Sequence, residues 1–233
     1  MNYNTITTFV SKRNRVCLAE SHTQQDLPPC RVVIKDFGQN IDSYHQELKI
    51  SRTLYDHGVS VPGILEVTED SIVYKYLEGT VAVDLLEQLE VHSDSAEILA
   101  VFDGICHWLK SCYDALEDAF SCEMILGDAH LRNFIYSDKV YGVDFECVTE
   151  GHRETDVANL AVFTVTYSPM CTPAKYKLAA FICKRCMELM ELDSSLLRRE
   201  MSTQLAIISN RRKIILPSEI VPSIWAIIEH ERL

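Results

Sequence analysis

The sequence predicts an α+β fold with two lobes: a small β-rich lobe with one helix, followed by a larger and mainly helical lobe. Short β-branched runs bounded by turn residues dominate residues 1–78, whereas long segments with helical periodicity dominate residues 79–233. The pattern changes near Leu77–Thr80, so the lobe boundary is placed there. Apolar residues make up 47% and charged residues 24% of the 233 residues, a composition typical of a globular chain with a sizeable core.

In the small lobe, strands are predicted where β-branched residues cluster, and one helix where apolar residues recur at helical spacing. Gly58 is a natural C-terminal stop for this helix. The predicted elements are two short strands within Thr7–Glu20 around the polar turn Ser11–Arg15, a strand over Cys30–Phe37, a helix over Asn40–His57, and an antiparallel pair formed by Gly63–Thr68 and Ser71–Leu77.

In the large lobe, a long helix is expected first, because apolar residues line one side of Ser93–Phe120 and Ser93 could cap it. A non-helical stretch follows, in which the runs Phe134–Tyr136 and Val140–Phe145 flank a Ser-Asp-Lys turn and predict a hairpin. Further helices are predicted near Asp156–Tyr167, Pro173–Leu192 and Ser195–Arg212, with a last one from about Pro217.

Composition excludes several classes of protein. With 22 basic and 34 acidic residues, the net charge of −12 argues against a general nucleic-acid binder, which needs a basic footprint. No apolar run approaches the roughly 18 residues of a membrane span, and Met1–Val10 does not resemble a secretory signal. Nine scattered cysteines, an odd number, favour reduced thiols and a cytoplasmic location over a disulfide framework.

The most informative stretch contains Asp128 and Asn133, followed by Asp144 at the end of the predicted hairpin. Phosphoryl transfer from ATP needs a carboxylate that takes the proton of the acceptor hydroxyl, and oxygen ligands that hold Mg²⁺ on the phosphates. The loop presents an acid and, five residues later, an amide ligand, and the hairpin returns a second carboxylate to the same place. Asp128 is therefore the candidate catalytic base, and Asn133 and Asp144 are the candidate metal ligands. Taken alone, the spacing of Asp128 and Asn133 favours a solvated turn, and the Asp-Phe pair at residues 144–145 is equally weak as a signal.

Two residues in the small lobe strengthen this interpretation. Lys35 lies at the end of the apolar run in the third predicted strand, and Glu47 lies on the helix that follows. In phosphotransferases a lysine of this kind holds the α- and β-phosphates and a glutamate orients it. Separately, Lys35 could be an ordinary edge-strand lysine and Glu47 an exposed helical carboxylate. Their order along the chain, ahead of the Asp128 loop, favours the functional interpretation.

These motifs resemble the protein-kinase-like phosphotransferases of the aminoglycoside phosphotransferase, choline kinase and RIO type, over about Arg31 to Ala161. The sequence Gly-Asp-Ala-His-Leu-Arg-Asn at residues 127–133 is similar to their His-Gly-Asp-Leu-His-x-x-Asn loop, with Leu126 in place of the first His, and to the loop of lipopolysaccharide-core sugar kinases. Asp-Phe-Glu at residues 144–146 resembles the choline kinase-like enzymes. The resemblance implies a protein-kinase-like two-lobed fold that uses ATP and Mg²⁺.

The resemblance also implies roles for further residues. Residues 73–79 look like the hinge, which would bind adenine through the Lys75 carbonyl and the Leu77 amide. Asp156 matches the acid that steadies the catalytic loop, and His130 is expected to be structural. Arg132, inside the loop, could contact the γ-phosphate or an anionic acceptor.

One departure concerns the loop that covers the phosphates in the family, which is often rich in glycine. No glycine occurs between Phe9 and Glu20, and Ser11–Arg15 occupies that place. Three alternatives follow: the loop uses side chains, it sits differently, or it holds ATP poorly.

The sequence therefore predicts an ATP- and Mg²⁺-dependent kinase that phosphorylates a hydroxyl group of a small molecule, such as a sugar or amino alcohol. Only nine residues separate Glu146 from Asp156, too few for the segment that docks peptides in ordinary protein kinases. The alternatives are an atypical RIO-like protein Ser/Thr kinase, with a protein substrate, and a pseudokinase that only binds a partner. The net charge favours a cationic or neutral acceptor. Arg211-Arg212-Lys213 is predicted to be a solvated helix face.

Overall fold

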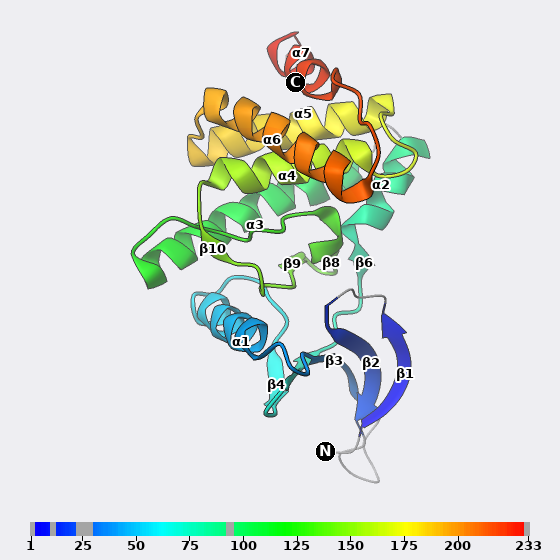
Figure 1. Ribbon diagram of the computed structural model, residues 1–233. Coiled ribbons are helices and arrows are strands. Elements are labelled where there is room, and N and C mark those ends of the chain that lie inside the picture. The colour runs from blue at the N-terminus through cyan, green and yellow to red at the C-terminus, as the bar shows by residue number, and fades with distance from the viewer. Residues whose placement is uncertain (1–2, 10–12, 22–29, 92–95, 231–233) are drawn as a thin grey trace.

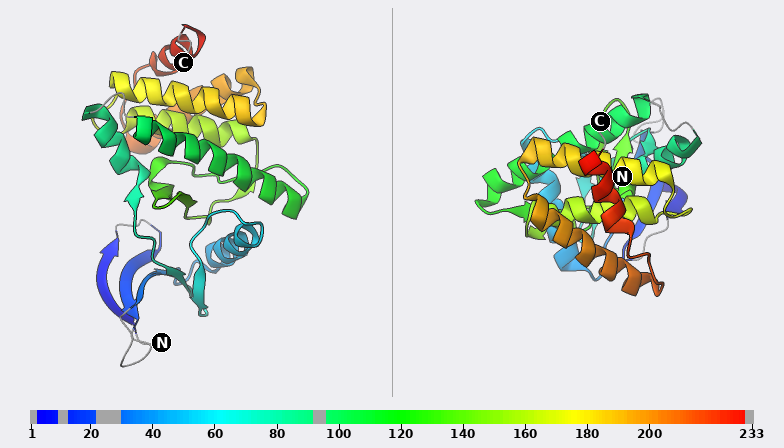
Figure 2. Two further views of the ribbon diagram at one scale, coloured as in Figure 1. Left: turned by 180° about the vertical axis from the view of Figure 1, so that it is seen from behind. Right: turned by 90° about the horizontal axis from the view of Figure 1, so that it is seen from above.

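The computed structural model describes residues 3–9, 13–21, 30–91 and 96–230, and it confirms the predicted α+β architecture (Figure 1). A five-stranded sheet and helix α1 (Ile41–Asp56) form one end of the molecule, and the other helices lie at the other end. The first and last described residues lie at opposite ends (Figure 1). The view from behind shows the same separation into a sheet-containing lobe and a helical lobe (Figure 2).

The sheet of the small lobe is antiparallel, with the strand order β1-β2-β3-β5-β4. Its strands are β1 (Tyr3–Phe9), β2 (Arg15–Ser21), β3 (Cys30–Asp36), β4 (Ile64–Val67) and β5 (Ser71–Lys75). Strand β1 begins at Tyr3, earlier than predicted. It is an exposed edge strand, and its sequence has too little apolar alternation to indicate where the strand starts. Most of the predicted turn Ser11–Arg15 lies outside the described residues, apart from Arg13, Asn14 and Arg15.

The helices of the large lobe are α3 (Ala96–Phe120), α4 (Arg153–Thr166), α5 (Pro173–Met190), α6 (Ser194–Arg212) and α7 (Ile220–His230). Helix α4 starts three residues before its predicted position and is buried along most of its length, so it forms the centre of the lobe. Ser93, the predicted cap of the long helix, lies outside the described residues. Among the helices that the structure describes, none is long and apolar enough to cross a membrane.

Helix α2 (Ala82–Val91) was not predicted. Its buried residues Ala82, Leu85, Leu86 and Leu89 follow the i, i+3, i+4, i+7 pattern of an amphipathic helix, so the signal was present in the sequence. The short strand β6 (Thr80–Val81) precedes α2 and pairs with β8 (Phe134–Tyr136), which in turn pairs with β9 (Val140–Gly142). The chain thus passes from the small lobe directly onto the predicted hairpin of the large lobe.

Two further short elements shape the chain near this hairpin. The 3-10 turn η1 (Leu131–Asn133) leads into β8, and β7 (Met124–Ile125) pairs with β10 (Thr149–Glu150). Packing between the lobes is continuous, because Ile50 and Leu54 of α1 join the main apolar core of the large lobe. Trp108 of α3 reinforces this contact by donating a hydrogen bond from Nε1 to the Ser60 carbonyl at 2.8 Å. Helix α1 and the residues that follow it therefore pack against α3 of the large lobe.

Candidate active site

The loop that carries Asp128 is tied to its own end and to the hairpin. The Asn133 side chain donates from Nδ2 to the Asp128 carbonyl at 3.0 Å, and the Val143 amide donates to the Asn133 carbonyl at 2.9 Å. The Asp128 side chain is 34% exposed, so its carboxylate is open to a ligand. The structure therefore places Asp128, Asn133 and the residue after Val143, Asp144, in one neighbourhood.

Asp156 of α4 fixes the start of the same loop. Its carboxylate accepts hydrogen bonds from the amides of Leu126 at 2.6 Å and Gly127 at 3.0 Å, and from the Tyr113 hydroxyl at 3.0 Å. Burial raises the pKa of Asp156 to about 6, although all three donors act in the opposite direction. These bonds agree with the steadying role that the resemblance implies for Asp156; the sequence had not indicated Tyr113.

Gly127 is required by this arrangement. Its φ is +74°, and a Cβ atom there would lie 2.4 Å from the Cys147 carbonyl oxygen. The left-handed backbone and the close approach both exclude a side chain. The sequence therefore keeps glycine directly before Asp128 for steric reasons.

The predicted ion pair between Lys35 and Glu47 is present: Lys35 Nζ lies 3.3 Å from Glu47 Oε2. Lys35 Nζ also lies 2.5 Å from Asp144 Oδ1 and 3.5 Å from Glu146 Oε2. Burial opposes the charge of Lys35, but the attraction of Glu47, Asp144 and Glu146 outweighs it and raises the pKa of Lys35. One cation from the small lobe thus faces three carboxylates, two of which come from the large lobe.

Glu47 connects α1 to the segment after the hairpin. Its Oε2 accepts a hydrogen bond from the Phe145 amide at 2.6 Å, and its Oε1 accepts one from the Tyr74 hydroxyl at 3.0 Å. Burial raises the pKa of Glu47, while the Lys35 charge and these two donors counteract it. Glu47 contacts both Lys35 and the Phe145 amide. Asp144 directly precedes Phe145 and pairs with Lys35, so these two contacts of Glu47 hold Asp144 in place.

Asp144 has a backbone conformation that marks it out. Its φ is +70°, a left-handed value that non-glycine residues rarely adopt and that occurs often at functional sites. Its side chain is 44% exposed and contacts Lys35 on one side only. A carboxylate from Asp144 and an amide oxygen from Asn133 are hard oxygen donors, so this pair fits a magnesium ion.

Glu146 is a site residue to which the sequence assigned no role of its own. Its side chain is 6% exposed and accepts a short hydrogen bond from Asn14 Nδ2. Arg13 Nη1 lies 3.6 Å from its Oε1 and donates to the Cys147 sulfur at 3.1 Å. The loop between β1 and β2 therefore reaches the large lobe through side chains. Asn14 and Arg13, together with Lys35, surround one carboxylate.

The two predicted hinge residues lie at the end of β5. The Lys75 amide donates to the Gly63 carbonyl at 2.8 Å, and the following Tyr76 amide donates to the Arg31 carbonyl at 3.3 Å. Within the described part of the chain, the Leu77 amide makes no backbone hydrogen bond. The assignment of Lys75 and Leu77 to adenine stays a prediction.

His130 and Arg132 flank Asp128 within the loop. His130 Nε2 lies 3.7 Å from Asp128 Oδ2, and burial lowers the pKa of His130, which favours its neutral form. Arg132 is exposed, and its guanidinium lies 6.0 Å from the centre of the Tyr167 ring. Its contact is therefore with Tyr167, the residue that follows α4.

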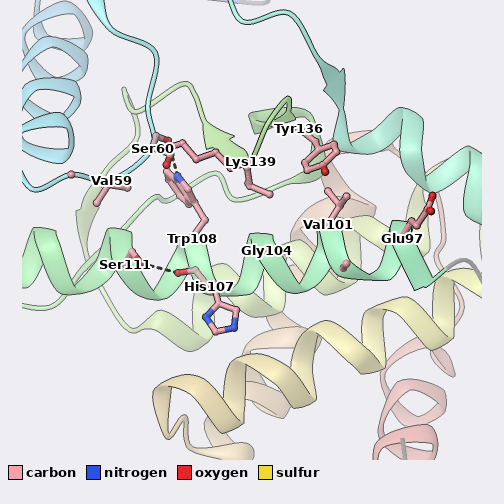
Figure 3. A pocket seen from close by; sticks show the side chains of 13 residues that line it. Val59, Ser60, Glu97, Val101, Gly104, His107, Trp108, Ser111, Tyr136 and Lys139 are labelled. Atoms are coloured by element: carbon pink, nitrogen blue, oxygen red, sulfur yellow. Dashed lines mark hydrogen bonds between the residues drawn. The ribbon is translucent and has the colours of Figure 1, made fainter.

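A pocket of about 400 Å³ lies between α3 and the β8–β9 hairpin (Figure 3). Glu97, His107 and Trp108 of α3 line one side, and Tyr136 and Lys139 of the hairpin line the other (Figure 3). None of the predicted site residues lines this pocket.

Comparison with known proteins supports the fold. No protein-family model and no curated protein matches the chain. Among solved structures, the chain is similar to "Amicoumacin kinase hAmiN in complex with AMP-PNP, Ca2+ and Ami", with a TM-score of 0.62 and 11% identity; the match covers 96% of this chain and 86% of that one. A likeness at this identity establishes the fold alone: the chain has the two-lobed, protein-kinase-like fold that its sequence predicts.

Proposed function

We propose that this chain is an ATP- and Mg²⁺-dependent phosphotransferase that moves the γ-phosphoryl group of ATP to a hydroxyl group of a small molecule. One observation carries the proposal: Lys35, paired with Glu47, meets Asp144 directly beside the loop of Asp128 and Asn133. The constellation combines a base, two oxygen ligands and a phosphate-binding cation, which are the parts that phosphoryl transfer requires. Residues 1–78 then hold the nucleotide, and residues 79–233 supply the catalytic loop, the metal ligands and the acceptor site.

In the proposed reaction, the Asp128 carboxylate orients the acceptor hydroxyl and takes its proton. The hydroxyl oxygen forms a bond to the γ-phosphorus, the bond to the β–γ bridging oxygen breaks, and ADP leaves with that electron pair. Lys35 holds the α- and β-phosphates. Asn133 and Asp144 would hold Mg²⁺, which supplies charge neutralisation on the phosphate oxygens.

The glycine-free loop is assigned to the phosphates through its side chains. Arg13 and Asn14 already contact a carboxylate, Glu146, which Lys35 also contacts. A phosphate group offers the same kind of anionic oxygen to these donors. Of the three alternatives for this loop, the contacts therefore favour binding by side chains. Lys75 and Leu77 complete the nucleotide site at the adenine end.

The test is phosphate transfer from radiolabelled ATP by the purified protein with Mg²⁺. One set of reactions contains hydroxylated metabolites, and the other a proteome extract. We expect label on a metabolite and a loss of about 10²–10⁴ in turnover for Asp128→Asn, the usual range for a positioned general base. Asp138→Asn, on the exposed turn of the hairpin, is the matched control.

The other outcomes separate the alternatives. Labelling of one specific protein and of no metabolite would favour the RIO-like protein kinase. Nucleotide binding without transfer or hydrolysis would favour the pseudokinase. Full activity of Asp128→Asn on the true acceptor would contradict the assignment of the base.

A further inference from the structure

Two arginines contact the end of α4, although the chain has a net charge of −12. Arg132 follows Asp128 in the catalytic loop. Arg212 comes from the end of α6, about eighty residues later in the sequence. Helices α4 and α6 run side by side across the large lobe (Figure 1). The end of α6 is thereby placed against the end of α4, where Arg212 contacts the chain next to Tyr167.

Arg212 is fixed in this position. Its Nη1 donates to the Thr166 carbonyl at 2.6 Å, and its guanidinium lies 5.3 Å from the centre of the Phe163 ring. Burial lowers the pKa of Arg212 because it removes water from the charged group. The prediction of a solvated helix face is thus wrong for Arg212 and holds for its exposed neighbour Arg211.

Aromatic contacts connect Arg212 to the catalytic loop. The His130 and Phe163 rings lie 5.4 Å apart, and the Phe163 and Tyr167 rings lie 6.1 Å apart. Arg132 lies over Tyr167, and His130 lies beside Asp128. The anion patch, defined as Arg132, Phe163, Tyr167 and Arg212, is therefore continuous with the base.

Within the anion patch, the charges of Arg132 and Arg212 both act on the Tyr167 hydroxyl. Burial raises the pKa of Tyr167 to about 12, and the charges of Arg132 and Arg212 both oppose that rise. Buried Lys175 donates to the Tyr167 carbonyl at 3.0 Å and anchors the backbone there. The two arginines thus converge on a tyrosine whose backbone is anchored.

Two other arginines of the large lobe, Arg153 and Arg185, have carboxylate partners, which Arg132 and Arg212 lack among the described residues. Arg153 lies near Asp114 and Glu117, and Arg185 lies near Asp103 and Glu188. In the part of the chain that the structure describes, neither Arg132 nor Arg212 has a carboxylate within ion-pair distance. A partly desolvated guanidinium is stabilised by an anion, and its fork of donors matches carboxylate and phosphate groups.

We propose that Arg132 and Arg212 bind an anionic group of the acceptor, a phosphate or a carboxylate, while Phe163 and Tyr167 contact its carbon skeleton. The proposal rests on the proposed function, because it places the acceptor hydroxyl at Asp128 and the anionic group on the anion patch. It replaces the expectation of a cationic or neutral acceptor. Recognition depends on the charges that face the ligand, and net charge gives only their sum over the whole molecule.

The test compares four related compounds as acceptors: glucose, glucosamine, glucose 6-phosphate and gluconate. The first two are neutral and cationic, and the last two carry the phosphate and the carboxylate. We expect kcat/KM to be at least about tenfold higher for one of the anionic compounds than for glucose, as one charge-assisted hydrogen bond would give. The two anionic compounds distinguish a phosphate from a carboxylate as the bound group.

Variants at α6 separate this site from the nucleotide site. Arg212→Gln is expected to reduce the ratio of kcat/KM between the anionic compound and glucose by about tenfold to a hundredfold. Arg211→Gln, one residue away and exposed, is expected to keep the ratio of the wild type. Arg212→Lys is a further variant that keeps the positive charge at this position. The melting temperature of every variant is measured, so that a loss of folding is recognised.

A second readout does not need turnover. Calorimetry follows the binding of glucose 6-phosphate and gluconate to protein saturated with a non-hydrolysable ATP analogue and Mg²⁺. Binding by wild type and Arg211→Gln, but not by Arg212→Gln, supports the anion patch even if no transfer occurs and the proposed function fails. A preference for glucose or glucosamine, or equal anion binding by Arg212→Gln, would overturn the proposal.

Discussion

Replacing Lys35 by methionine tests whether one cation holds the two lobes together at the site. Met has nearly the same length as Lys and keeps the packing of the buried stem while removing the charge. In the folded variant, Glu47, Asp144 and Glu146 would remain clustered without their shared cation. Glu47 and Glu146 are 3% and 6% exposed, so water cannot compensate for the loss.

The distances set the expected magnitude. At 3.3 Å, the Coulomb attraction of one pair is about 5 kcal/mol in an effective dielectric of roughly 20, before desolvation is subtracted. Removing one partner of a buried pair costs about 3–5 kcal/mol, because the remaining charge stays uncompensated. Lys110→Met is the matched control: Lys110 pairs with Asp114 at 2.5 Å, but both side chains are more than 40% exposed. Its loss should cost about 0.2–1 kcal/mol.

The measurement is the free energy of unfolding in urea at about pH 7.5 and pH 5. Without Lys35, burial holds the pKa of Glu47 above its value in the unfolded chain, so the folded variant binds protons more tightly. The deficit of Lys35→Met relative to wild type should therefore be largest at pH 7.5 and shrink toward pH 5. If Lys35→Met cost no more than Lys110→Met, or if its deficit did not change with pH, the account of this ion cluster would be refuted.

Three further changes probe other parts of the site. Asp144→Asn should abolish the Mg²⁺-dependent part of ATP affinity, because a carboxylate ligand is lost; calorimetric titrations that matched wild type would remove Asp144 from the site. Arg13→Ala should weaken ATP binding about tenfold, with the exposed Arg15→Ala as control, and an equal effect of both would exclude a specific contact. The pKa of Asp156 is about 3.9 in the unfolded chain and is raised to about 6 in the folded chain. Protonation of Asp156 therefore contributes stability that is complete below about pH 3.9 and is lost as the pH rises through 6. The stability of wild type relative to Asp156→Asn should fall by roughly 2 kcal/mol between pH 4 and 7 in urea unfolding, and a constant difference would show that burial does not hold the proton.

The sequence could predict those parts of the fold and site that depend on local pattern. Lys35 at the end of a β-branched run and Glu47 on the next helix were found because each element has a clear period, and the structure places their charged atoms 3.3 Å apart. Asp128, Asn133 and Asp144 were found because their spacing reflects a short loop and hairpin. Their positions agree with the structure, while their chemical roles remain predictions.

The parts that the sequence did not predict depend on contacts between distant segments. Arg212 looks like any basic residue at a helix end, and only the packing of α6 on α4 brings it over Phe163. Tyr113 becomes a partner of Asp156 because α3 and α4 meet. Helix α2 is a different case, because the helical spacing of its leucines is visible in the sequence without any knowledge of distant contacts.

The chain departs from the pattern of its fold at two places, and the structure brings these two places into contact. The loop between β1 and β2 has no glycine, and a glutamate, Glu146, stands where Asp-Phe-Gly has glycine. In the structure these two substitutions meet, because Asn14 and Arg13 of that loop contact the Glu146 carboxylate next to Lys35. The buried cation at this point is Lys35, whereas Arg13 is 60% exposed, and a buried positive group needs a counter-ion. Glu146 is one of the three carboxylates that supply it. Under the proposed function, nucleotide phosphates would compete with Glu146 for Lys35, Arg13 and Asn14.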